Sequence, residues 1–375
     1  MPTKFKKIIS GKYFSKIFLL CYVLFMGFSA YETNSALCLL TNRPHLYGAV
    51  YIIFAVIGIA IILKENLRFK IKNRLYKKTT GFLSCFLIYY LLIIVVWEIA
   101  SLIFKVTDAV KAVGVIVSLF AAMLIVICGY IRTKEIKIKP YEVTLGNKNK
   151  DYKIALISDI HLGVFVGAVH IRKMVEKINS LNPDIVVIAG DIFNGDNALL
   201  EDSSRLKEIS KEFCKLKAKE GVFAVAGNHD PKTNNKPFKY FVKDAGIRIL
   251  NNDAMLLSEI NLIGRADDTH NVRTEITDIL SKADSDKPIV VIDHKPENIP
   301  DSAKHDVDLV LCGHTHKGQL FPVTILTRLA NGKKCFYGYH RQGKTHSIIT
   351  SGVGFFELPV RIGSNNEIVD IKISL

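Results

Sequence analysis

The chain has 375 residues, a length typical of two or three structural units rather than one small fold. Its 49% hydrophobic fraction excludes a disordered or collagen-like protein. Residues 1–132 carry 16 basic and 4 acidic residues, a net charge of +12, whereas residues 133–375 carry 34 and 31, a net charge of +3. The basic excess therefore accompanies the apolar first third, which argues against a nucleic-acid-binding protein.

Four apolar segments in this first third are long enough to cross a bilayer. They predict an all-α membrane domain over residues 1–132, with spans at about 13–31, 46–63, 81–104 and 112–130. The first segment has a signal peptide as its alternative, and the three spans that follow favour an anchor. Glu98, beside Trp97, is interpreted as an interfacial residue in preference to an intramembrane proton or substrate site.

The distribution of Lys and Arg predicts the orientation of these spans. The amino-terminal tail, the 64–78 loop and the segment after the fourth span are basic, whereas the 31–45 and 105–111 loops carry few cations. Basic loops stay on the cytoplasmic side. The sequence therefore predicts a multi-pass protein of the cell membrane, with the remainder of the chain in the cytoplasm.

From about residue 150, short β-branched segments alternate with segments of helical period. The five apolar runs are IALIS (154–158), IVVIAG (185–190), VFAVAG (222–227), PIVVID (288–293) and DLVLCG (308–313). With helices expected over 168–180 and 199–219, this alternation predicts an α/β fold with a largely parallel sheet. We expect residues 133–150 to form a connector and first strand, and residues 151–375 to fold as a domain without the membrane part.

Each of the five runs ends in residue types that bind metal ions. These are Asp159, His161, Asp191, Asn228, His294, His314 and His316. Ligands bind outside the carboxyl ends of strands in such sheets, so we expect these side chains to converge. Seven donors are too many for one open site and fit two divalent ions about 4 Å apart, sharing a carboxylate. The nitrogen and oxygen donors suit Mn, Fe, Zn or a similar metal.

The order and spacing of these motifs resemble the calcineurin-like metallophosphoesterase superfamily. The motifs are Asp-x-His (159–161), Gly-Asp (190–191), Gly-Asn-His-Asp (227–230), the isolated His294 and Gly-His-Thr-His (313–316), and the resemblance covers about residues 150–375. The text "YGYHRQGK" and "SGVGFFELPVRIGSNNEI" is similar, more narrowly, to the membrane-anchored bacterial branch typified by YkuE and YaeI.

The resemblance implies a four-layer α/β/β/α sandwich behind the membrane domain. It assigns one metal ion to Asp159, His161, Asp191 and His316, and the other to Asp191, Asn228, His294 and His314. It also places His229 near the leaving group, where we expect it to act as a general acid with Asp230 orienting its imidazole. The "GNHD" motif departs from the Gly-Asn-His-Glu of protein Ser/Thr phosphatases, which disfavours a phosphoprotein substrate.

The resulting hypothesis is a membrane-anchored, metal-dependent hydrolase of phosphodiester or pyrophosphate bonds. Lipid-linked phosphoesters are the first candidate substrates because the membrane domain would hold the site beside lipid head groups. The alternatives are a soluble nucleotide phosphodiesterase, a broad phosphomonoesterase or, from another class, a catalytically silent membrane scaffold or sensor. The expected partners are the phosphoester and the membrane, with no nucleic acid.

Overall fold

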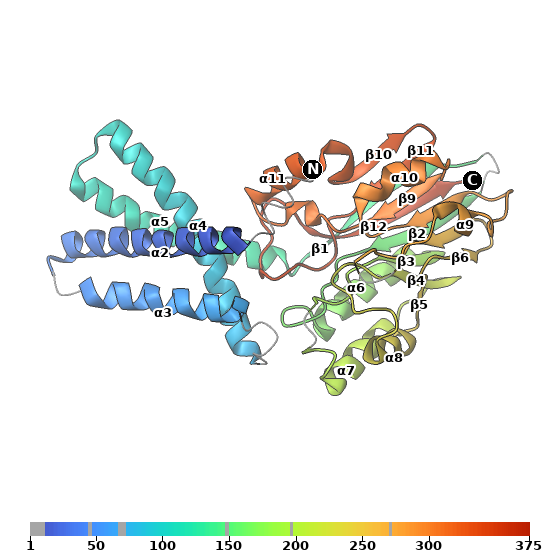
Figure 1. Ribbon diagram of the computed structural model, residues 1–375, viewed down its shortest axis with the longest axis horizontal. Coiled ribbons are helices and arrows are strands. Elements are labelled where there is room, and N and C mark those ends of the chain that lie inside the picture. The colour runs from blue at the N-terminus through green and yellow to red at the C-terminus, as the bar shows by residue number, and fades with distance from the viewer. Residues whose placement is uncertain (1–11, 44–46, 67–72, 147–149, 196–197, 270–271) are drawn as a thin grey trace. The chain divides into compact units, whose positions relative to one another are not determined.

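The computed structural model describes residues 12–43, 47–66, 73–146, 150–195, 198–269 and 272–375. The chain divides into two compact units, Met1–Tyr130 and Ile131–Leu375 (Figure 1). The described part of the first unit is helical, and the second unit combines helices with two sheets.

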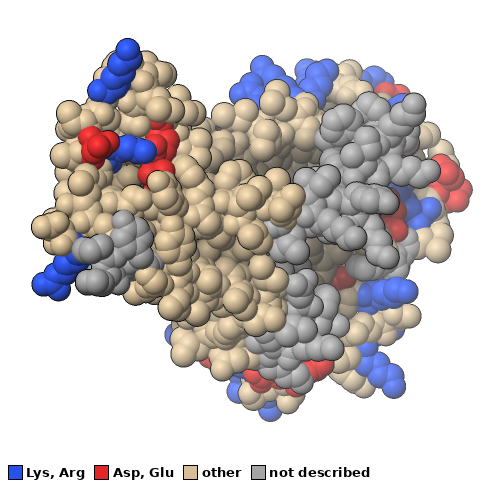
Figure 2. Space-filling view, turned by 60° about the vertical axis from the view of Figure 1, so that its left-hand side comes forward, with Lys and Arg blue, Asp and Glu red and all other residues tan. Residues whose placement is uncertain are grey.

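The described residues of the first unit include four apolar helices, which overlap the predicted apolar segments. They are α2 (Lys12–Thr41), α3 (Tyr47–Asn66), α4 (Arg74–Phe104) and α5, which runs from Asp108 to Arg132. Three segments, Leu20–Thr41, Arg74–Phe104 and Asp108–Arg132, are long and apolar enough to cross a membrane, and Gly48–Leu63 is a shorter apolar helix. Figure 2 shows the broad, largely uncharged surface of this unit. The basic residues 1–11 and 67–72 lie outside the described residues.

Helix α2 extends beyond the predicted span. The expected helix ends at residue 31 and is followed by a loop, but the observed helix continues to Thr41. The polar residues that suggested a loop are buried within the unit: the hydroxyl of Thr33 lies 2.7 Å from that of Tyr90 and donates to the carbonyl of Ser29 at 2.6 Å. Because the Thr33 hydroxyl bonds to a carbonyl of its own helix and contacts Tyr90 of α4, the helix can continue where the sequence becomes polar.

Glu98 takes part in an ion-pair network. Lys111 Nζ lies 2.8 Å from Glu98 and 3.5 Å from Glu32, so one lysine joins carboxylates from two other helices. The indole nitrogen of Trp97 donates to the carbonyl of Lys111 at 3.1 Å. Lys111 therefore connects α2, α4 and α5. The sequence interpretation paired Glu98 with Trp97 at the interface and did not include this ion pair.

The second unit contains two six-stranded sheets. In the first, the order is β1 (Ile136–Thr144), β12 (Asn366–Ser374), β2 (Asp151–Ile157), β3 (Ile185–Ala189), β4 (Gly221–Val225) and β5 (Ile247–Ile249). In the second, it is β10 (Gly338–Gln342), β11 (Thr345–Ile349), β9 (Leu309–Cys312), β8 (Ile289–Ile292), β7 (Asn261–Gly264) and β6 (Asp253–Leu256). Seven of the ten pairings between the described strands are parallel, as the sequence predicts. Both sheets are nevertheless mixed, since β12, β6 and β10 each run antiparallel to one neighbour.

The five predicted apolar runs are confirmed as β2, β3, β4, β8 and β9. Helix α6 (Ala168–Leu181) also matches its prediction, but the helix expected over 199–219 is only α7, Ser203–Phe213. Asp202 caps its first turn by accepting from the amide of Arg205, and residues 219–220 instead bond to the carbonyls of residues 183–184 beside the sheet. The unit also contains α8 (Lys236–Asp244), α9 (Ile276–Leu280), α10 (Ile299–Lys304) and α11 (Val323–Asn331).

Alternate residues of the central strands contribute to different hydrophobic clusters. Leu156 of β2 packs in a cluster with Val290 and Leu311 from the second sheet, whereas Ile157 belongs to a cluster that includes residues of α6, α7 and α8. A third cluster combines Val310 and other residues of the second sheet with α9 and α10. Because both faces of these strands are buried, their sequences are continuously apolar.

The pairing of strand β1 predicts that a stable soluble fragment must include this strand. It pairs with β12 over nine residues, and its Ile136 and Val143 are buried. A fragment of residues 131–375 should unfold cooperatively. The free energy of unfolding of a fragment of residues 151–375 should be roughly 3 kcal/mol or more below that of residues 131–375. Two buried aliphatic side chains are missing from it, and β12 becomes an open edge. Urea unfolding and light scattering of both fragments test this, and equal stability of the two would contradict it.

Candidate metal centre

The candidate donors converge at the carboxyl ends of strands from both sheets. Asp159 and His161 follow β2, Asp191 follows β3, Asn228 follows β4, His294 follows β8, and His314 and His316 follow β9. Backbone bonds tie the loops together: the amide of Asp159 donates to the carbonyl of Gly190 at 3.0 Å, and that of Gly313 to the carbonyl of His294 at 3.2 Å. The sequence expectation that these seven side chains come together agrees with this geometry.

One group of donor atoms consists of Asp159, His161 and His316. The Nε2 atoms of the two imidazoles lie 3.0 Å apart. Oδ1 of Asp159 lies 3.4 Å from Nε2 of His316. Oδ2 of Asp191 also lies 3.7 Å from Nε2 of His161. Two imidazole nitrogens and two carboxylates at this spacing can coordinate one divalent ion together.

A second group consists of Asp159, Asp191 and His294. Nε2 of His294 lies 3.3 Å from Oδ2 of Asp191, 3.0 Å from Oδ1 of Asn228 and 3.2 Å from Nδ1 of His314. Both carboxylates therefore lie between the two groups, whereas the family resemblance assigned the shared position to Asp191 alone.

The tautomer of His294 tests whether this second group fits a cation. Its Nδ1 lies 2.8 Å from the carbonyl oxygen of Ala189, which can only accept, so Nδ1 carries the proton. In the neutral ring Nε2 then presents a lone pair to the oxygens of Asp191 and Asn228. Three acceptors that face one another require a positive charge between them, so these residues fit a bound cation.

Burial and charge set the protonation of the donors. Burial lowers the pKa of His161 to about 3 and that of His316 well below its ordinary value, so both imidazoles are neutral and can bind a metal ion. Burial also lowers the pKa of His294, but Asp191 outweighs this effect and raises it to about 10. Burial raises the pKa of Asp191, but His294 and other imidazoles reverse this shift and lower it. A metal ion at His294 would therefore replace a proton.

The donor loops hold their side chains through an unusual backbone conformation. Asp159, His161, Asp191, His314 and His316 all have positive φ, between 51° and 73°. Non-glycine residues rarely adopt this left-handed region, and each costs on the order of 1 kcal/mol or more. A cluster of five such residues is typical of a functional site, where surrounding contacts compensate for strain.

Two motif glycines allow the donors to approach one another. A Cβ atom on Gly227 would lie 2.2 Å from Oδ1 of Asp191, and one on Gly190, which has φ +84°, would lie 2.5 Å from Nδ1 of His294. No side chain larger than hydrogen fits at either position without moving a donor. The Gly-Asp and Gly-Asn-His-Asp motifs therefore bring their own loops into contact with the centre.

His229 lies at the rim of the centre, and Asp230 lies behind it. The amide of His229 donates to Oδ1 of Asp191 at 2.9 Å, and its ring centroid is 5.4 Å from that of His161. In the described structure the carboxylate of Asp230 accepts from the backbone amides of Gly227 and Phe193, at 2.9 and 2.8 Å. Asp230 therefore braces two loops, and the role of orienting the imidazole of His229 stays a prediction.

The structure also shows residues around the centre that the sequence motifs did not indicate. Arg361 is completely buried, and its guanidinium donates to the carbonyls of Ser351, Gly354 and His316, at 3.3 Å for the last. Burial lowers its pKa only to about 10, so it remains charged near neutral pH. Because it fixes the backbone of His316, Arg361 is a positioning residue.

Phe356 forms an apolar wall beside the rim. Its ring centroid lies 4.4 Å from that of His229 and 5.0 Å from that of His161. Gln319 holds this loop by accepting from the amide of Phe356 and donating to its carbonyl, at 2.8 and 3.0 Å. "GFFELP" carries no motif that would have indicated this contact, since it depends on segments far apart in the chain.

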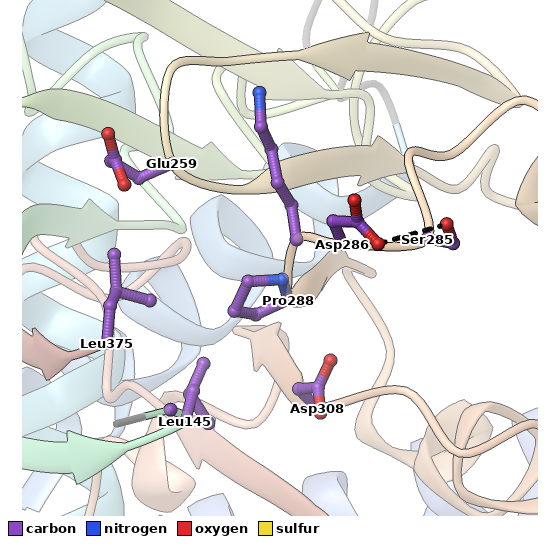
Figure 3. Close-up of a pocket in the computed structure, with 9 residues that line it drawn as sticks. Leu145, Glu259, Ser285, Asp286, Pro288, Asp308 and Leu375 are labelled. Carbon is purple, nitrogen blue, oxygen red and sulfur yellow. Dashed lines mark hydrogen bonds between the residues drawn. The ribbon is translucent and has the colours of Figure 1, made fainter. Parts of the chain in front are cut away.

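A separate pocket of about 260 Å³ lies away from these donors (Figure 3). It is lined by Leu145, Gly146, Glu259, Ser285, Asp286, Lys287, Pro288, Asp308 and Leu375. Lys287 and Pro288 precede β8, and Asp308 precedes β9, so this pocket lies at the amino ends of strands whose carboxyl ends carry the donors. It contains none of the candidate metal-binding residues.

Comparison with known proteins shows which family this region resembles. Residues 152–318 match the family model of calcineurin-like phosphoesterases, and this span contains every candidate donor. The match and the names of related proteins support the calcineurin-like metallophosphoesterase superfamily. The matched span and the donor groups also agree with metal binding.

Among related proteins, an uncharacterized metallophosphoesterase of Helicobacter pylori J99 is 32% identical over 243 residues, covering 63% of this chain and 64% of the relative. A transmembrane protein with metallophosphoesterase domain from Danio rerio is 32% identical, over 58% of this chain and 52% of the relative. This chain thus spans less than two thirds of either relative. YkuE of Bacillus subtilis is 26% identical over 58% of this chain and 77% of YkuE, so the narrower branch is only distantly supported.

Replacement of Arg361 tests its positioning role. Arg361→Met leaves several buried carbonyls without a donor, so it should destabilise the protein by about 3 kcal/mol or more and lower the thermal midpoint by roughly 6 °C or more. Metal content at limiting metal should fall as well, because the backbone of His316 is released. Arg341→Met is the control: Arg341 is exposed and should change stability by less than about 0.5 kcal/mol. Equal behaviour of the two variants would contradict the assignment.

Proposed function

We propose that the protein is a membrane-anchored, dinuclear metal-dependent phosphoesterase that hydrolyses phosphodiester or pyrophosphate bonds. The observation that carries this proposal is the convergence of two donor groups that share Asp159. Asp191, in the second group, also lies 3.7 Å from His161 of the first. Two cations in one site suit in-line displacement at phosphorus, because both the entering and the leaving oxygen need charge stabilisation. The proposed donors are those predicted from the sequence: Asp159, His161, Asp191, Asn228, His294, His314 and His316.

When bound, divalent cations supply Lewis-acid charge at phosphorus and lower the pKa of water. The chain itself supplies the proton for the departing oxygen. Asp191 holds the backbone of His229, which keeps the imidazole beside the donors, and Phe356 covers one side of that ring. A positioned imidazole can donate to an alkoxide leaving group, so we assign His229 as the general acid.

Lipid-linked phosphoesters are the proposed substrate class. The apolar helices of the first unit and the transmembrane relatives support a membrane protein. We propose four spans, a cytoplasmic second unit and an α/β/β/α arrangement of its layers. A catalytic unit tethered in this way meets lipid phosphoesters at a much higher local concentration than soluble ones.

A soluble nucleotide phosphodiesterase or a broad phosphomonoesterase is the alternative within the same chemistry. Purified protein assayed with lipid and nucleotide phosphoesters, with Mn, Fe, Zn and Mg supplied separately, distinguishes these substrates. A catalytically silent scaffold or sensor would bind metal without turnover of any of them.

Two substitutions separate metal binding from proton donation. Asp191→Ala removes a carboxylate that lies between both donor groups, so it should lose at least one metal equivalent together with activity. His229→Ala should retain both metals and the fold but reduce turnover of an alkyl phosphodiester by about 10²- to 10⁴-fold. With p-nitrophenolate, which leaves without protonation, the loss should be much smaller.

Metal analysis and turnover of both substrates on each purified variant are the measurements. His305→Ala is the control, since it removes an imidazole outside the centre and should change neither quantity. If His229→Ala lost its metals, or slowed both substrates equally, His229 would be a ligand or a phosphate-binding residue instead of the acid.

The proposed orientation predicts which cysteine substitutions a membrane-impermeant maleimide can reach. In a background that lacks the seven native cysteines, Lys148→Cys should be labelled only after the cells are permeabilised. Arg43→Cys, in the segment predicted to lie outside, is the matched control and should be labelled in intact cells. Labelling of Lys148→Cys in intact cells would place the second unit on the outer side.

A further inference from the structure

Helix α11 (Val323–Asn331; Figure 1) has an exposed apolar face, although it belongs to the second unit. None of its residues is buried, and the exposed fractions of Val323, Ile325, Leu326 and Leu329 are 43%, 50%, 62% and 75%. We call these four residues the α11 face. Other large apolar side chains that are exposed in the described part of this unit, such as Val169 and Tyr240, are scattered. A concentrated apolar surface of this kind usually marks an interaction site.

The sequence around the α11 face is strongly basic. From Lys317 to Phe356 the chain contains six Lys and Arg residues and no Asp or Glu. Three of the cations, Arg328, Lys333 and Lys334, lie on α11 or directly after it and are exposed. An apolar helical face with flanking cations is the composition of helices that lie in the surface of an anionic bilayer.

The α11 face is also coupled to the candidate metal centre through the backbone. The helix follows His316 by seven residues, and the amide of Thr324 donates to the carbonyl of Leu320 at 2.9 Å. A Cβ atom on Gly318 would lie 2.5 Å from the Cα of Thr324, so the first turn of α11 packs directly on the loop after His316. A surface that binds α11 therefore meets the protein close to this donor loop.

We propose that α11 is an interfacial helix that inserts the α11 face into the surface of an anionic lipid bilayer. At about 14 Å, a nine-residue helix would bind a bilayer weakly by itself. The apolar helices of the first unit remove this difficulty, because they keep α11 at a high local concentration near lipid. The cations then stabilise docking by roughly 1 kcal/mol each near anionic head groups. This inference needs a membrane protein but does not depend on catalysis.

Tryptophan quenching in the full chain tests this inference. Trp97 is the single tryptophan of the sequence, so Trp97→Phe gives a dark background. Leu329→Trp places a reporter on the α11 face, and Tyr240→Trp, on α8, is a matched control at another exposed apolar residue. Each protein is reconstituted in phosphatidylcholine–phosphatidylglycerol vesicles with brominated acyl chains. We expect the Leu329→Trp reporter to be quenched at least about twofold more strongly than the control.

A charge variant tests the electrostatic part. Lys333→Glu combined with Lys334→Glu should lower the ratio of docked to undocked α11 by at least about tenfold, and vesicles of phosphatidylcholine alone should weaken quenching as well. Circular dichroism and the thermal midpoint of each variant establish that it is folded.

Two results would overturn the inference. Equal quenching of the Leu329→Trp and Tyr240→Trp reporters would show that α11 has no preferred contact with lipid. A blue-shifted but unquenched Leu329→Trp reporter whose emission depends on protein density in the vesicle would show that the α11 face binds a second copy of the chain. Because no turnover is measured, either result leaves the proposed phosphoesterase activity untouched.

Discussion

The attraction between Asp191 and the imidazoles around it is the interaction on which the candidate centre depends. One oxygen of this carboxylate lies close to His294 and His161, while the other fixes the amide of His229. Without a positive charge nearby, a buried carboxylate of this kind would be costly. The same requirement that makes these side chains expensive to bury makes them effective ligands, since a bound cation satisfies all of them together.

The two sheets supply this centre in different ways. The first contributes Asp159, His161, Asp191 and Asn228 from the ends of β2, β3 and β4, and the second contributes histidines from the ends of β8 and β9. Each strand end is rigid because both faces of the strand are buried. The strained left-handed residues therefore sit on elements whose packing can hold them, and the buried guanidinium of Arg361 stabilises the last donor loop.

The helical unit and the α/β unit compensate buried charges in related ways. In the first unit, Lys111 balances Glu98 and Glu32 among apolar helices, and in the second, imidazoles balance carboxylates among apolar strands. In both, polar residues far apart in sequence satisfy one another within an apolar environment. The α11 face, in contrast, is an apolar surface that no described residue of its unit buries. The proposed lipid partner would remove these side chains from water.

The sequence by itself determined the apolar helices, the five strands and the seven candidate donors, because each depends on local patterns: uninterrupted apolar length, β-branched runs and polar residues at their ends. Tertiary structure alone decided that each sheet includes antiparallel strands, that α2 continues through polar residues, and that Asp230 braces two loops. It also brought Arg361 to the carbonyl of His316, 45 residues away in the chain. These features depend on which distant groups meet after folding, and no local pattern encodes the hydrogen-bond partner that a buried polar side chain will find.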